Sequence, residues 1–445
     1  MHSVRLERRT EFDYFAKSKI QWGSIKYSSV TLFKEMTLTD YISNSKSLIS
    51  GEETVKILDL GLHGFADSFF EKEDLDIADQ AFPLVCQLDT NTGLVQTLNF
   101  SNPETRYSGV DYSYTSSNSQ DARRHWGNFA QYLEKSSNNF YSSSILEIGS
   151  NDGYLLSLLK GKVGNLLGVD ASPFMCRLAN DSQIKTLNGV FGESNSLDLL
   201  ILEHDAKYDI IIANNVLNHS NDPVRFIEKV FTFLKESGTF VFEVPYWLET
   251  IKSLHFDQIY HEHVTYFTVK SIRHLLDFAQ MNITNVEVVD YHGGSLRISA
   301  RRRNFTESSE VMKYIKMEED EGLFNIERYH KYFKDICAIR DSFLTDLNEK
   351  IKKIPHVRIF GVGAAAKANT LLTFYGFDSS RMEFIVDASP HKQGKFTPVT
   401  KIPILSDEAI QGISNGLGVV LAWNLSELVK KKLYLLNPEL ELILI

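Results

Sequence analysis

Short apolar runs and turn-forming glycines alternate with helix-like segments in two separate stretches of the chain. In the first stretch the runs predict buried strands, at residues 143–150, 165–172, 208–216 and 238–246. A helix is expected to begin at Tyr154, directly after the first of these strands. In the second stretch similar runs lie at residues 356–363, 383–390 and 418–424. Strands that alternate with helices predict parallel βαβ units, so we expect two doubly wound α/β domains.

The rest of the chain has a different pattern. Residues up to about 120 are mixed and turn-rich, with strand-like pieces at residues 55–61 and 93–100. A charged run at residues 311–336 favours helix between the two α/β stretches. The predicted domains are a small N-terminal domain, a middle α/β domain and a C-terminal α/β domain, at residues 1–120, 121–300 and 301–445.

Composition narrows the function classes. The chain has 445 residues, 43% hydrophobic and 23% charged, which is typical of a globular protein with two or three domains. Its net charge of −10 disfavours nucleic-acid binding. No apolar run reaches the roughly 18 residues of a membrane span, and the N-terminus has no apolar segment typical of a secretory signal. The three cysteines are far apart, which predicts a reducing, cytoplasmic location.

The first glycine-rich turn, LEIGSNDGYLL, joins a predicted strand to a predicted helix. Glycines allow close approach of a ligand, and the helix start offers free N–H donors. Asp170, at the end of the next strand, could accept hydrogen bonds from both hydroxyls of a ribose. The turn does not follow the G-x-G-x-x-G pattern of dinucleotide-binding sites. Its acidic residues, Glu147 and Asp152, instead favour a cationic, amino-acid-bearing ligand such as S-adenosylmethionine. The candidate cofactor residues are Glu147, Gly149, Ser150, Asn151, Asp152, Gly153, Asp170, Asn214 and Asn215. A strand–turn–helix without a ligand is the alternative.

The second glycine-rich turn, FGVGAAAKANT, matches a dinucleotide-binding fingerprint. Gly361, Gly363 and Ala366 follow G-x-G-x-x-A, and Asp387 ends a strand about 20 residues on. Taken alone, this turn indicates an NAD-dependent dehydrogenase.

The stretch QIYHEHVTYF concentrates Tyr260, His261, Glu262 and His263 in apolar chain. A metal site, an acid–base site and a structural hydrogen-bond cluster are all compatible with it. If the stretch were a strand, Tyr260 and Glu262 would share one face, and His261 and His263 the other. A His-x-His pair on one face could bind a metal, but no third ligand motif follows.

Several blocks together resemble the S-adenosylmethionine-dependent sugar C-methyltransferases, which add a carbon-bound methyl group to deoxysugars. The blocks span roughly residues 47–445 and occur in one order: ILDLG, FPL with GLVQ, DYSYTSSNS, LEIGSNDGYLL, ANNVLNH, FDQIYHEHVTYF, HGGSLR, GAAAKANTLL, IVDASPHKQGKFTP and LAWN. The resemblance implies that the middle domain has the class I methyltransferase fold and binds S-adenosylmethionine. It implies that the C-terminal Rossmann-like domain carries no nicotinamide cofactor, and that a nucleotide-linked 4-keto-deoxysugar lies beside both domains.

The resemblance has one large departure. Family members begin with two cysteine pairs that bind a structural zinc, but the corresponding positions here are Ser47, Ser50, Asp89 and Thr92. Structural zinc sites use thiolate or imidazole ligands. We therefore expect no metal, and a small domain held together by packing.

The resemblance also places the family's catalytic cluster on QIYHEHVTYF. A methyl group can be added to C3 of the sugar if a base removes its proton and donors stabilise the enolate at the C4 oxygen. His263 is the expected base, Tyr260 the donor to the oxygen, and Glu262 the group that orients a neighbour. His219 and Tyr114 are expected to assist. The candidate substrate-binding residues are Tyr112, His261, His292, Arg297, Lys367, Asn369 and Lys392, with Arg297 and Lys367 as diphosphate ligands.

Two other function classes stay open. One is an enzyme that acts on a nucleotide-linked ketosugar through other chemistry, either an epimerase that uses the same enolate or an NAD-dependent oxidoreductase. The other is a non-catalytic scaffold that has lost its metal. The sequence leaves the identity of the sugar, its nucleotide and the oligomeric state undetermined.

Overall fold

The computed structural model describes residues 45–76, 81–98, 106, 115–117, 119–137, 139–193, 195–423 and 426–445. These residues belong to one compact unit, Asn44–Ile445. Within them the strands form three sheets, of seven, five and four strands. No helix in these ranges is long and apolar enough to cross a bilayer.

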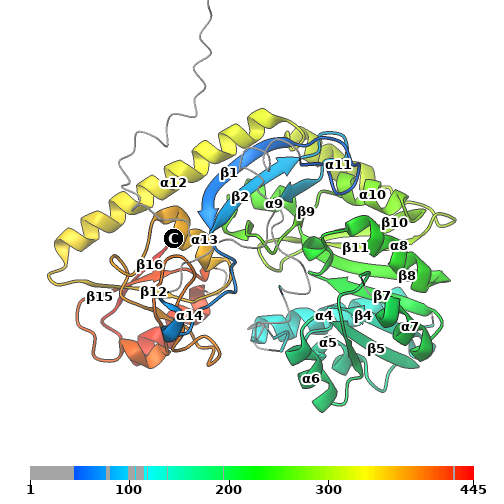
Figure 1. Ribbon diagram of the computed structural model, residues 1–445, viewed down its shortest axis with the longest axis horizontal. Helices are drawn as coiled ribbons and strands as arrows, with labels where there is room; N and C mark the ends of the chain where they lie inside the picture. The colour runs from blue at the N-terminus through cyan, green and yellow to red at the C-terminus, as the bar shows by residue number, and fades with distance from the viewer. Residues whose placement is uncertain are drawn as a thin grey trace, which may run out of the picture. The chain divides into compact units, whose positions relative to one another are not determined.

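The seven-stranded sheet has the order β10-β11-β8-β7-β4-β5-β6 (Figure 1). Its strands are β4 (Ser144–Ile148), β5 (Asn165–Asp170), β6 (Thr186–Asn188), β7 (Tyr208–Asn214), β8 (Leu234–Pro245), β10 (Met281–Val289) and β11 (Ser295–Arg302). The strands β4 to β8 are parallel, and β11 runs antiparallel to β8 and β10. This is the class I methyltransferase fold, which confirms the expected fold class. The β10–β11 hairpin was not predicted from the sequence.

The first of the following helices precedes β4 along the chain, and the others connect the parallel strands of this sheet. They are α4 (Gln120–Ser136), α5 (Tyr154–Leu159), α6 (Pro173–Asp181), α7 (Asn195–His204) and α8 (Pro223–Phe233). The start of α5 at Tyr154 confirms the prediction from the sequence. Helices α6 and α8 begin with a proline after a polar cap: Ser172 accepts the N–H of Met175, and Asp222 accepts that of Arg225. The caps fix where each helix leaves the carboxyl edge of the sheet.

The five-stranded sheet is parallel throughout and has the order β14-β13-β12-β15-β16. Its strands are β12 (Arg358–Val362), β13 (Ile385–Val386), β14 (Ile404–Leu405), β15 (Gly416–Val420) and β16 (Glu441–Leu444), with helices α13 (Ala368–Tyr375) and α14 (Ser426–Leu436). The second predicted α/β stretch is therefore confirmed.

Two helices join the α/β sheets along the chain. The charged run is helical as predicted, but it breaks between α11 (Glu310–Asp320) and α12 (Ile326–Lys353). Asn325 caps the second helix by accepting the N–H of Glu327 at 3.0 Å. Figure 1 shows α12 as a single long helix.

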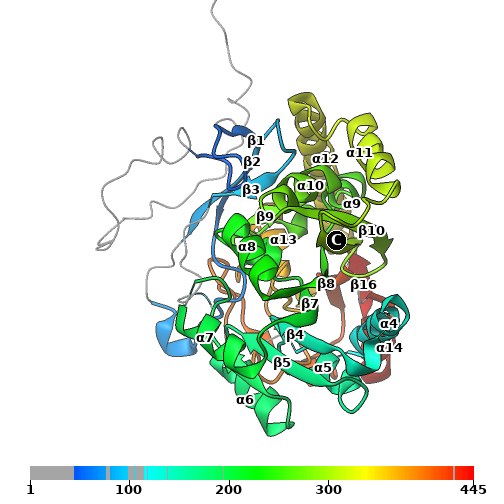
Figure 2. The ribbon, with the colours of Figure 1, turned by 90° about the vertical axis from the view of Figure 1, so that its right-hand side faces the viewer.

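The four-stranded sheet combines distant parts of the chain. It consists of β1 (Val55–His63), β2 (Phe82–Leu88), β3 (Val95–Thr97) and β9 (Thr265–Tyr266), in that order (Figure 2). The first three strands lie in the predicted N-terminal domain, whereas β9 follows the QIYHEH stretch. The antiparallel pairing of β3 with β9 therefore attaches the small sheet directly to the candidate catalytic segment. Helices α9 (Trp247–Lys252) and α10 (Val269–Asp277) flank that segment in the chain.

Candidate functional site

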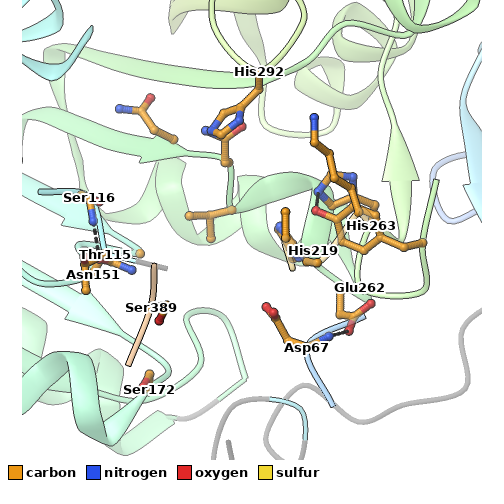
Figure 3. Close-up of a pocket in the computed structure, with 18 of the residues that line it drawn as sticks. Asp67, Thr115, Ser116, Asn151, Ser172, His219, Glu262, His263, His292 and Ser389 are labelled. Carbon is orange, nitrogen blue, oxygen red and sulfur yellow. Dashed lines mark hydrogen bonds between the residues drawn. The ribbon is translucent and has the colours of Figure 1, made fainter. Parts of the chain in front are cut away.

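A cavity of about 930 Å³ is lined by three parts of the chain. These are the carboxyl edge of the seven-stranded sheet, the segment around residues 258–263, and the carboxyl edge of the five-stranded sheet. Figure 3 shows Asn151, Ser116 and Ser172 on one side of the cavity and His219, Glu262 and His263 on the other. The cavity is large enough for two small-molecule ligands.

Asp170 lies at the cavity edge of β5, where a ribose-binding acid was expected. Its Oδ2 accepts the N–H of Asn151 at 2.8 Å and its Oδ1 accepts the N–H of Ser172 at 2.8 Å. Burial raises the pKa of Asp170 to about 6, although these two N–H donors favour the carboxylate. Gly149, at the turn after β4, has a φ of 70°. The turn thus gives a ligand close access to the backbone beside a carboxylate.

Two buried polar groups at this edge have no hydrogen-bond partner among the residues that the structure describes. They are Oε2 of Glu147, and both side-chain amide atoms of Asn214 at the end of β7. Burial raises the pKa of Glu147 well above its usual range. Both residues line the cavity. Groups of this kind suit a ligand with an ammonium group and several hydroxyls, which S-adenosylmethionine has.

Not every candidate cofactor residue lines the cavity. Asn151, Asn215 and Gly149 do, but Ser150, Asp152 and Gly153 do not. The carboxylate of Asp152 instead accepts both the N–H and the hydroxyl of Ser117, so its expected ligand contact is replaced by a contact within the chain. The sequence analysis missed several lining residues of this edge: Ser172, Gly189, Val190 and Phe191. They directly follow β5 and β6, and this position at the carboxyl ends of parallel strands could have indicated them.

Residues 260–263 form a turn, not the strand on which the face assignment was based. The N–H of His263 donates to the carbonyl of Tyr260 at 3.0 Å, and the strand begins at Thr265. The turn brings two side chains together that a strand would separate: the Tyr260 hydroxyl lies 2.6 Å from Nε2 of His263. Both side chains line the cavity.

The hydrogen bonds of His263 define its tautomer. Nδ1 lies 2.9 Å from the carbonyl of Gln258, which can only accept, so Nδ1 carries the proton. Nε2 is then the acceptor for the Tyr260 hydroxyl. Burial, with the nearby His219 as a further cause, lowers the pKa of His263 well below its usual range. The imidazole is therefore neutral and can take up a proton at Nε2 or through the phenol.

His219 and His261 have different surroundings. The ring of His219 lies 4.9 Å from that of His263, edge to face, and lines the cavity. Burial lowers the pKa of His219 to about 3, and Arg106 holds its carbonyl at 3.1 Å. His261 is buried outside the cavity lining, with Nε2 3.3 Å from the carbonyl of Pro83. His261 therefore contacts the N-terminal part of the chain, and its predicted role in substrate binding stays a prediction.

The Glu262 carboxylate is hydrogen-bonded to a turn of the N-terminal part of the chain and not to a histidine side chain. Its Oε1 accepts the N–H of Ala66 at 2.8 Å and that of Asp67 at 3.4 Å (Figure 3). Its Oε2 is buried without a partner. Burial, with the nearby Asp67 as a further cause, raises the pKa of Glu262 to about 7. The expected orienting role is thus replaced by a contact that fixes one wall of the cavity.

Two candidate lysines line the cavity from the five-stranded sheet. Nζ of Lys367 lies 3.5 Å from Oδ2 of Asp257 and 3.8 Å from the centre of the Trp423 ring. Nζ of Lys392 donates to the carbonyl of Ala364 at 2.7 Å. His292 also lines the cavity. Burial lowers the pKa of both Lys367 and His292.

Arg297 and Asn369 do not line the cavity. The Arg297 guanidinium is buried, with Nε 2.7 Å from Oε1 of Glu243, so it is neutralised by the fold and is not available to a diphosphate. The Asn369 amide donates to the carbonyl of Ala66, the turn that Glu262 also binds. Both substrate assignments remain predictions, and the structure gives each side chain a partner within the fold. Tyr112 and Tyr114 lie outside the described residues.

Asp387 repeats the geometry of Asp170 in the other sheet. Its Oδ2 accepts the N–H of Ala364 at 2.7 Å and its Oδ1 accepts that of Ser389 at 2.8 Å. Each aspartate stands in the sequence VDASP, and each lines the cavity. A Cβ on Gly363 would lie 2.6 Å from Cβ of Ala422, and one on Gly361 would lie 2.9 Å from Ile385 and Met382. Packing between strands therefore accounts for both glycines of the second turn.

The four positions that correspond to zinc ligands form a hydrogen-bonded cluster. Oδ2 of Asp89 accepts the hydroxyls of Ser50 and Thr92, each at 2.7 Å, and Oδ1 accepts the N–H of Thr92 at 3.2 Å. The Ser47 hydroxyl accepts the N–H of Ser50 at 3.2 Å. Hydrogen bonds hold this corner together in addition to the expected packing. Over the ranges that the structure describes, no three His, Cys, Asp or Glu side chains gather to hold a metal.

Comparison with known proteins identifies two domains in the chain. Residues 120–287 match a methyltransferase domain, and residues 290–443 match a C-methyltransferase C-terminal domain. The chain is 26% identical over 284 residues to the C-methyltransferase NovU of Streptomyces niveus, covering 63% of this chain and 66% of that protein. It is 30% identical over 112 residues to an arsenite methyltransferase of Aquipseudomonas alcaligenes, covering 23% of this chain and 32% of that protein. The chain therefore spans just under two thirds of the length of the first relative and about one third of the length of the second.

Solved methyltransferase structures align with part of the chain. A methyltransferase from Clostridium acetobutylicum that depends on S-adenosylmethionine aligns with 40% of this chain and 92% of its own, at 17% identity and a TM-score of 0.33. Magnesium protoporphyrin IX methyltransferase from Synechocystis aligns with 40% of this chain and 79% of its own, at 14% identity and a TM-score of 0.31. Together, the domain matches and the order of the seven strands identify the middle region as a methyltransferase domain of the class that uses S-adenosylmethionine.

Proposed function

We propose that this chain is an S-adenosylmethionine-dependent C-methyltransferase that methylates the carbon next to the ketone of a nucleotide-linked 4-keto-deoxysugar, at C3. The observation that carries the proposal is the Tyr260–His263 pair, 2.6 Å apart, in the same cavity as the cofactor edge around Gly149 and Asp170. A neutral base beside a hydroxyl donor is what the removal of a proton next to a ketone requires. The match to a C-methyltransferase C-terminal domain supports transfer to carbon.

The two side chains divide the proton chemistry between them. Nε2 of His263 accepts the proton from C3, while Gln258 keeps the proton on Nδ1. When the substrate enters, the Tyr260 hydroxyl turns from Nε2 of His263 to the C4 oxygen, which frees the Nε2 lone pair for the C3 proton. The hydroxyl then donates to the C4 oxygen as negative charge develops there, because a donor lowers the energy of the enolate. When bound, S-adenosylmethionine supplies an electrophilic methyl group. The partly buried cavity keeps water from the carbanion equivalent.

We assign the nucleotide part of the substrate to the five-stranded sheet. Asp387 presents the same carboxylate geometry as Asp170, which suits a sugar hydroxyl of a nucleoside. Lys367 and Lys392 line the same region and are cations suited to a diphosphate. The free state of all three cysteines accords with a cytoplasmic reaction, which we include in the proposal.

Two measurements test the proposal. Calorimetric titration with S-adenosylhomocysteine and, separately, NADH should show binding of the former alone; binding of NADH alone would make the chain an oxidoreductase. A nucleotide-linked 4-ketosugar incubated in D2O with S-adenosylhomocysteine should then exchange its C3 proton, and the variant His263→Gln should not exchange it. Exchange with inversion at C3 and no methyl transfer from S-adenosylmethionine would favour the epimerase.

A further inference from the structure

The segment that follows the Tyr260–His263 turn is held by the small N-terminal sheet. The hydroxyl of Thr97 donates to the carbonyl of His263 at 3.0 Å, and the N–H of Thr97 donates to the carbonyl of Val264 at 2.9 Å. One residue further on, β3 pairs with β9 through Gln96 and Thr265. The backbone of His263 is therefore attached to β3 from one side, while its ring is attached to Gln258 from the other.

The position of β3 depends in turn on the cluster around Asp89. Asp89 is 1% exposed and stands at the β2–β3 turn, where its N–H donates to the carbonyl of Leu94 at 2.8 Å. Its carboxylate accepts the Ser50 hydroxyl across a gap of 39 residues in the chain. Gln96 of β3 also binds the segment that precedes Ser50. Its side-chain amide accepts the N–H of Leu48 at 2.9 Å and donates to the carbonyl of Lys46 at 2.9 Å.

We propose that this sheet is a positioning platform for His263, with Thr97 as the positioning residue in direct contact and Asp89 as the anchor that holds β3 in place. The proposal rests on the proposed role of His263 as the base. A buried carboxylate that accepts two hydroxyls and two backbone N–H groups gives a rigid corner without a metal. Because the Thr97 hydroxyl donates to the His263 carbonyl, a fixed β3 also fixes the backbone of His263 and hence the position of its ring.

The physical reason is the narrow geometry that proton transfer needs. The ring of His263 makes two hydrogen bonds at once, 2.9 Å to Gln258 and 2.6 Å to Tyr260. Displacement of the backbone by a fraction of an ångström weakens both bonds together and mixes the two neutral tautomers. Misplacement of a reacting group by about 1 Å can reduce a rate by about 10²-fold.

The chain offers a matched set of variants. Thr97→Val removes the hydroxyl at constant size, and Thr97→Ser restores it. Thr265→Val is the control, because the buried Thr265 hydroxyl lies in the paired strand and meets no hydrogen-bond partner in the described part of the chain. Asp89→Asn, which removes the charge but keeps the shape, tests the anchor.

The readouts are the nitrogen NMR shifts of the His263 ring and the rate of C3 proton exchange in D2O, with affinity for S-adenosylhomocysteine as a check on folding. In Thr97→Val we expect a mixed tautomer and an exchange rate lower by roughly tenfold to a hundredfold at unchanged affinity. Thr97→Ser and Thr265→Val should match the wild type, and Asp89→Asn should move in the direction of Thr97→Val.

Two results would overturn the proposal: wild-type ring shifts and exchange in Thr97→Val, or losses in Thr97→Val that appear equally as lost affinity and lost melting temperature. Failure of the proposed function gives a different pattern. The wild type would then bind no S-adenosylhomocysteine and exchange no proton, while the ring shifts of His263 would still report whether Thr97 holds it.

Discussion

Asp170 and Asp387 occupy equivalent positions in two different sheets of the same chain. Each follows a valine at the end of a parallel strand, precedes Ala-Ser-Pro, and accepts one N–H from a glycine-rich turn and one from the serine two residues on. Both line one cavity. The proposed function assigns a ligand to each of these two carboxylates, so the two residues can be tested against each other.

Affinity for S-adenosylhomocysteine should depend on the ionisation of Asp170. Burial holds the pKa of Asp170 at about 6, and a ribose hydroxyl donates to the carboxylate, not to the neutral acid. The dissociation constant should therefore be flat above pH 7 and rise as the pH falls below about 6, by up to tenfold per unit. Calorimetry between pH 5 and 8 measures it.

The variant Asp170→Asn should bind S-adenosylhomocysteine about 10- to 100-fold more weakly at pH 8, in line with about 1.5–3 kcal/mol for a hydrogen bond to a charged group. Its affinity should no longer change near pH 6. Asp387→Asn is the matched control and should leave this affinity unchanged. Equal losses in the two variants would contradict the assignment of the cofactor to the seven-stranded sheet.

Removal of the Tyr260 hydroxyl should slow the reaction without weakening cofactor binding. In Tyr260→Phe both the hydrogen bond to His263 and the donor to the C4 oxygen are lost, so proton exchange and methyl transfer should fall by about 10²–10⁴-fold. Tyr141→Phe, at a tyrosine that is 69% exposed, should behave as the wild type. A rate within twofold of wild type in Tyr260→Phe would remove the phenol from the mechanism.

Stability should fall as the pH rises through neutrality because of Glu262. Its pKa is raised from 4.5 to about 7 in the folded chain, so its contribution is fully present below about pH 4.5 and is lost as the pH rises through 7. Glu262→Gln keeps an acceptor for the N–H of Ala66 but carries no charge, so its melting temperature should change less between pH 5 and 8. Between pH 5 and 8 the free energy of unfolding of the wild type is expected to fall by on the order of 1–3 kcal/mol more than that of Glu262→Gln. Parallel melting curves of the two proteins would contradict this.

Arg297 should matter for stability and not for substrate affinity. Its guanidinium is 8% exposed against a fully buried Glu243. Arg297→Met removes this permanent positive charge and leaves the carboxylate hydrogen-bonded to the His125 imidazole, 2.7 Å from Oε2. We expect a loss of about 3–5 kcal/mol in chemical denaturation, with an unchanged KM for the nucleotide sugar below the melting temperature. Arg303→Met, which breaks an exposed pair with Asp277, should lose less than about 1 kcal/mol. A raised KM in Arg297→Met would restore its role as a diphosphate ligand.

The second glycine-rich turn should be sensitive to packing. In Gly363→Ala the added Cβ meets Ala422 at 2.6 Å, and the φ of 89° disfavours any side chain, so the folded chain should be destabilised by about 1–3 kcal/mol. Gly127→Ala, in helix α4 with nothing within 4 Å of its Cβ, should be stabilised by about 0.5–1 kcal/mol. Thermal unfolding of both variants provides the comparison.

The sequence predicted the α/β stretches well because buried parallel strands are nearly continuous apolar runs. The runs at residues 143–150 and 165–172 became β4 and β5, and the turn between β4 and α5 faces the cavity as expected. Asp170 was identified from its place at a strand end alone. Local pattern and position at the carboxyl edge of a sheet were sufficient to place Asp170 at the cavity, and its role in cofactor binding stays a prediction.

The rest of the site depended on contacts between distant residues. A period of two placed Tyr260 and His263 on opposite faces, whereas the bond from the His263 N–H to the Tyr260 carbonyl folds them together. Arg297 was predicted to bind an anion because it is a cation beside glycines. Glu243, which is 54 residues away in sequence, pairs with its guanidinium in the folded chain. Neither of these two contacts can be predicted from the local pattern of apolar and polar residues. The hydrogen-bonded cluster around Asp89 likewise becomes visible only when Ser50 and Asp89 are seen together.

The placement of β9 in the small sheet has a consequence for synthesis of the chain. Strands β1 to β3 leave the ribosome well before Thr265 and Tyr266 exist, so their last edge, at β3, must wait unpaired through translation of most of the methyltransferase domain. The turn at Ala66 waits longer still, until Asn369 has been made. The small sheet can therefore be completed only after the middle domain has been made, and until then its open edge is accessible to chaperones.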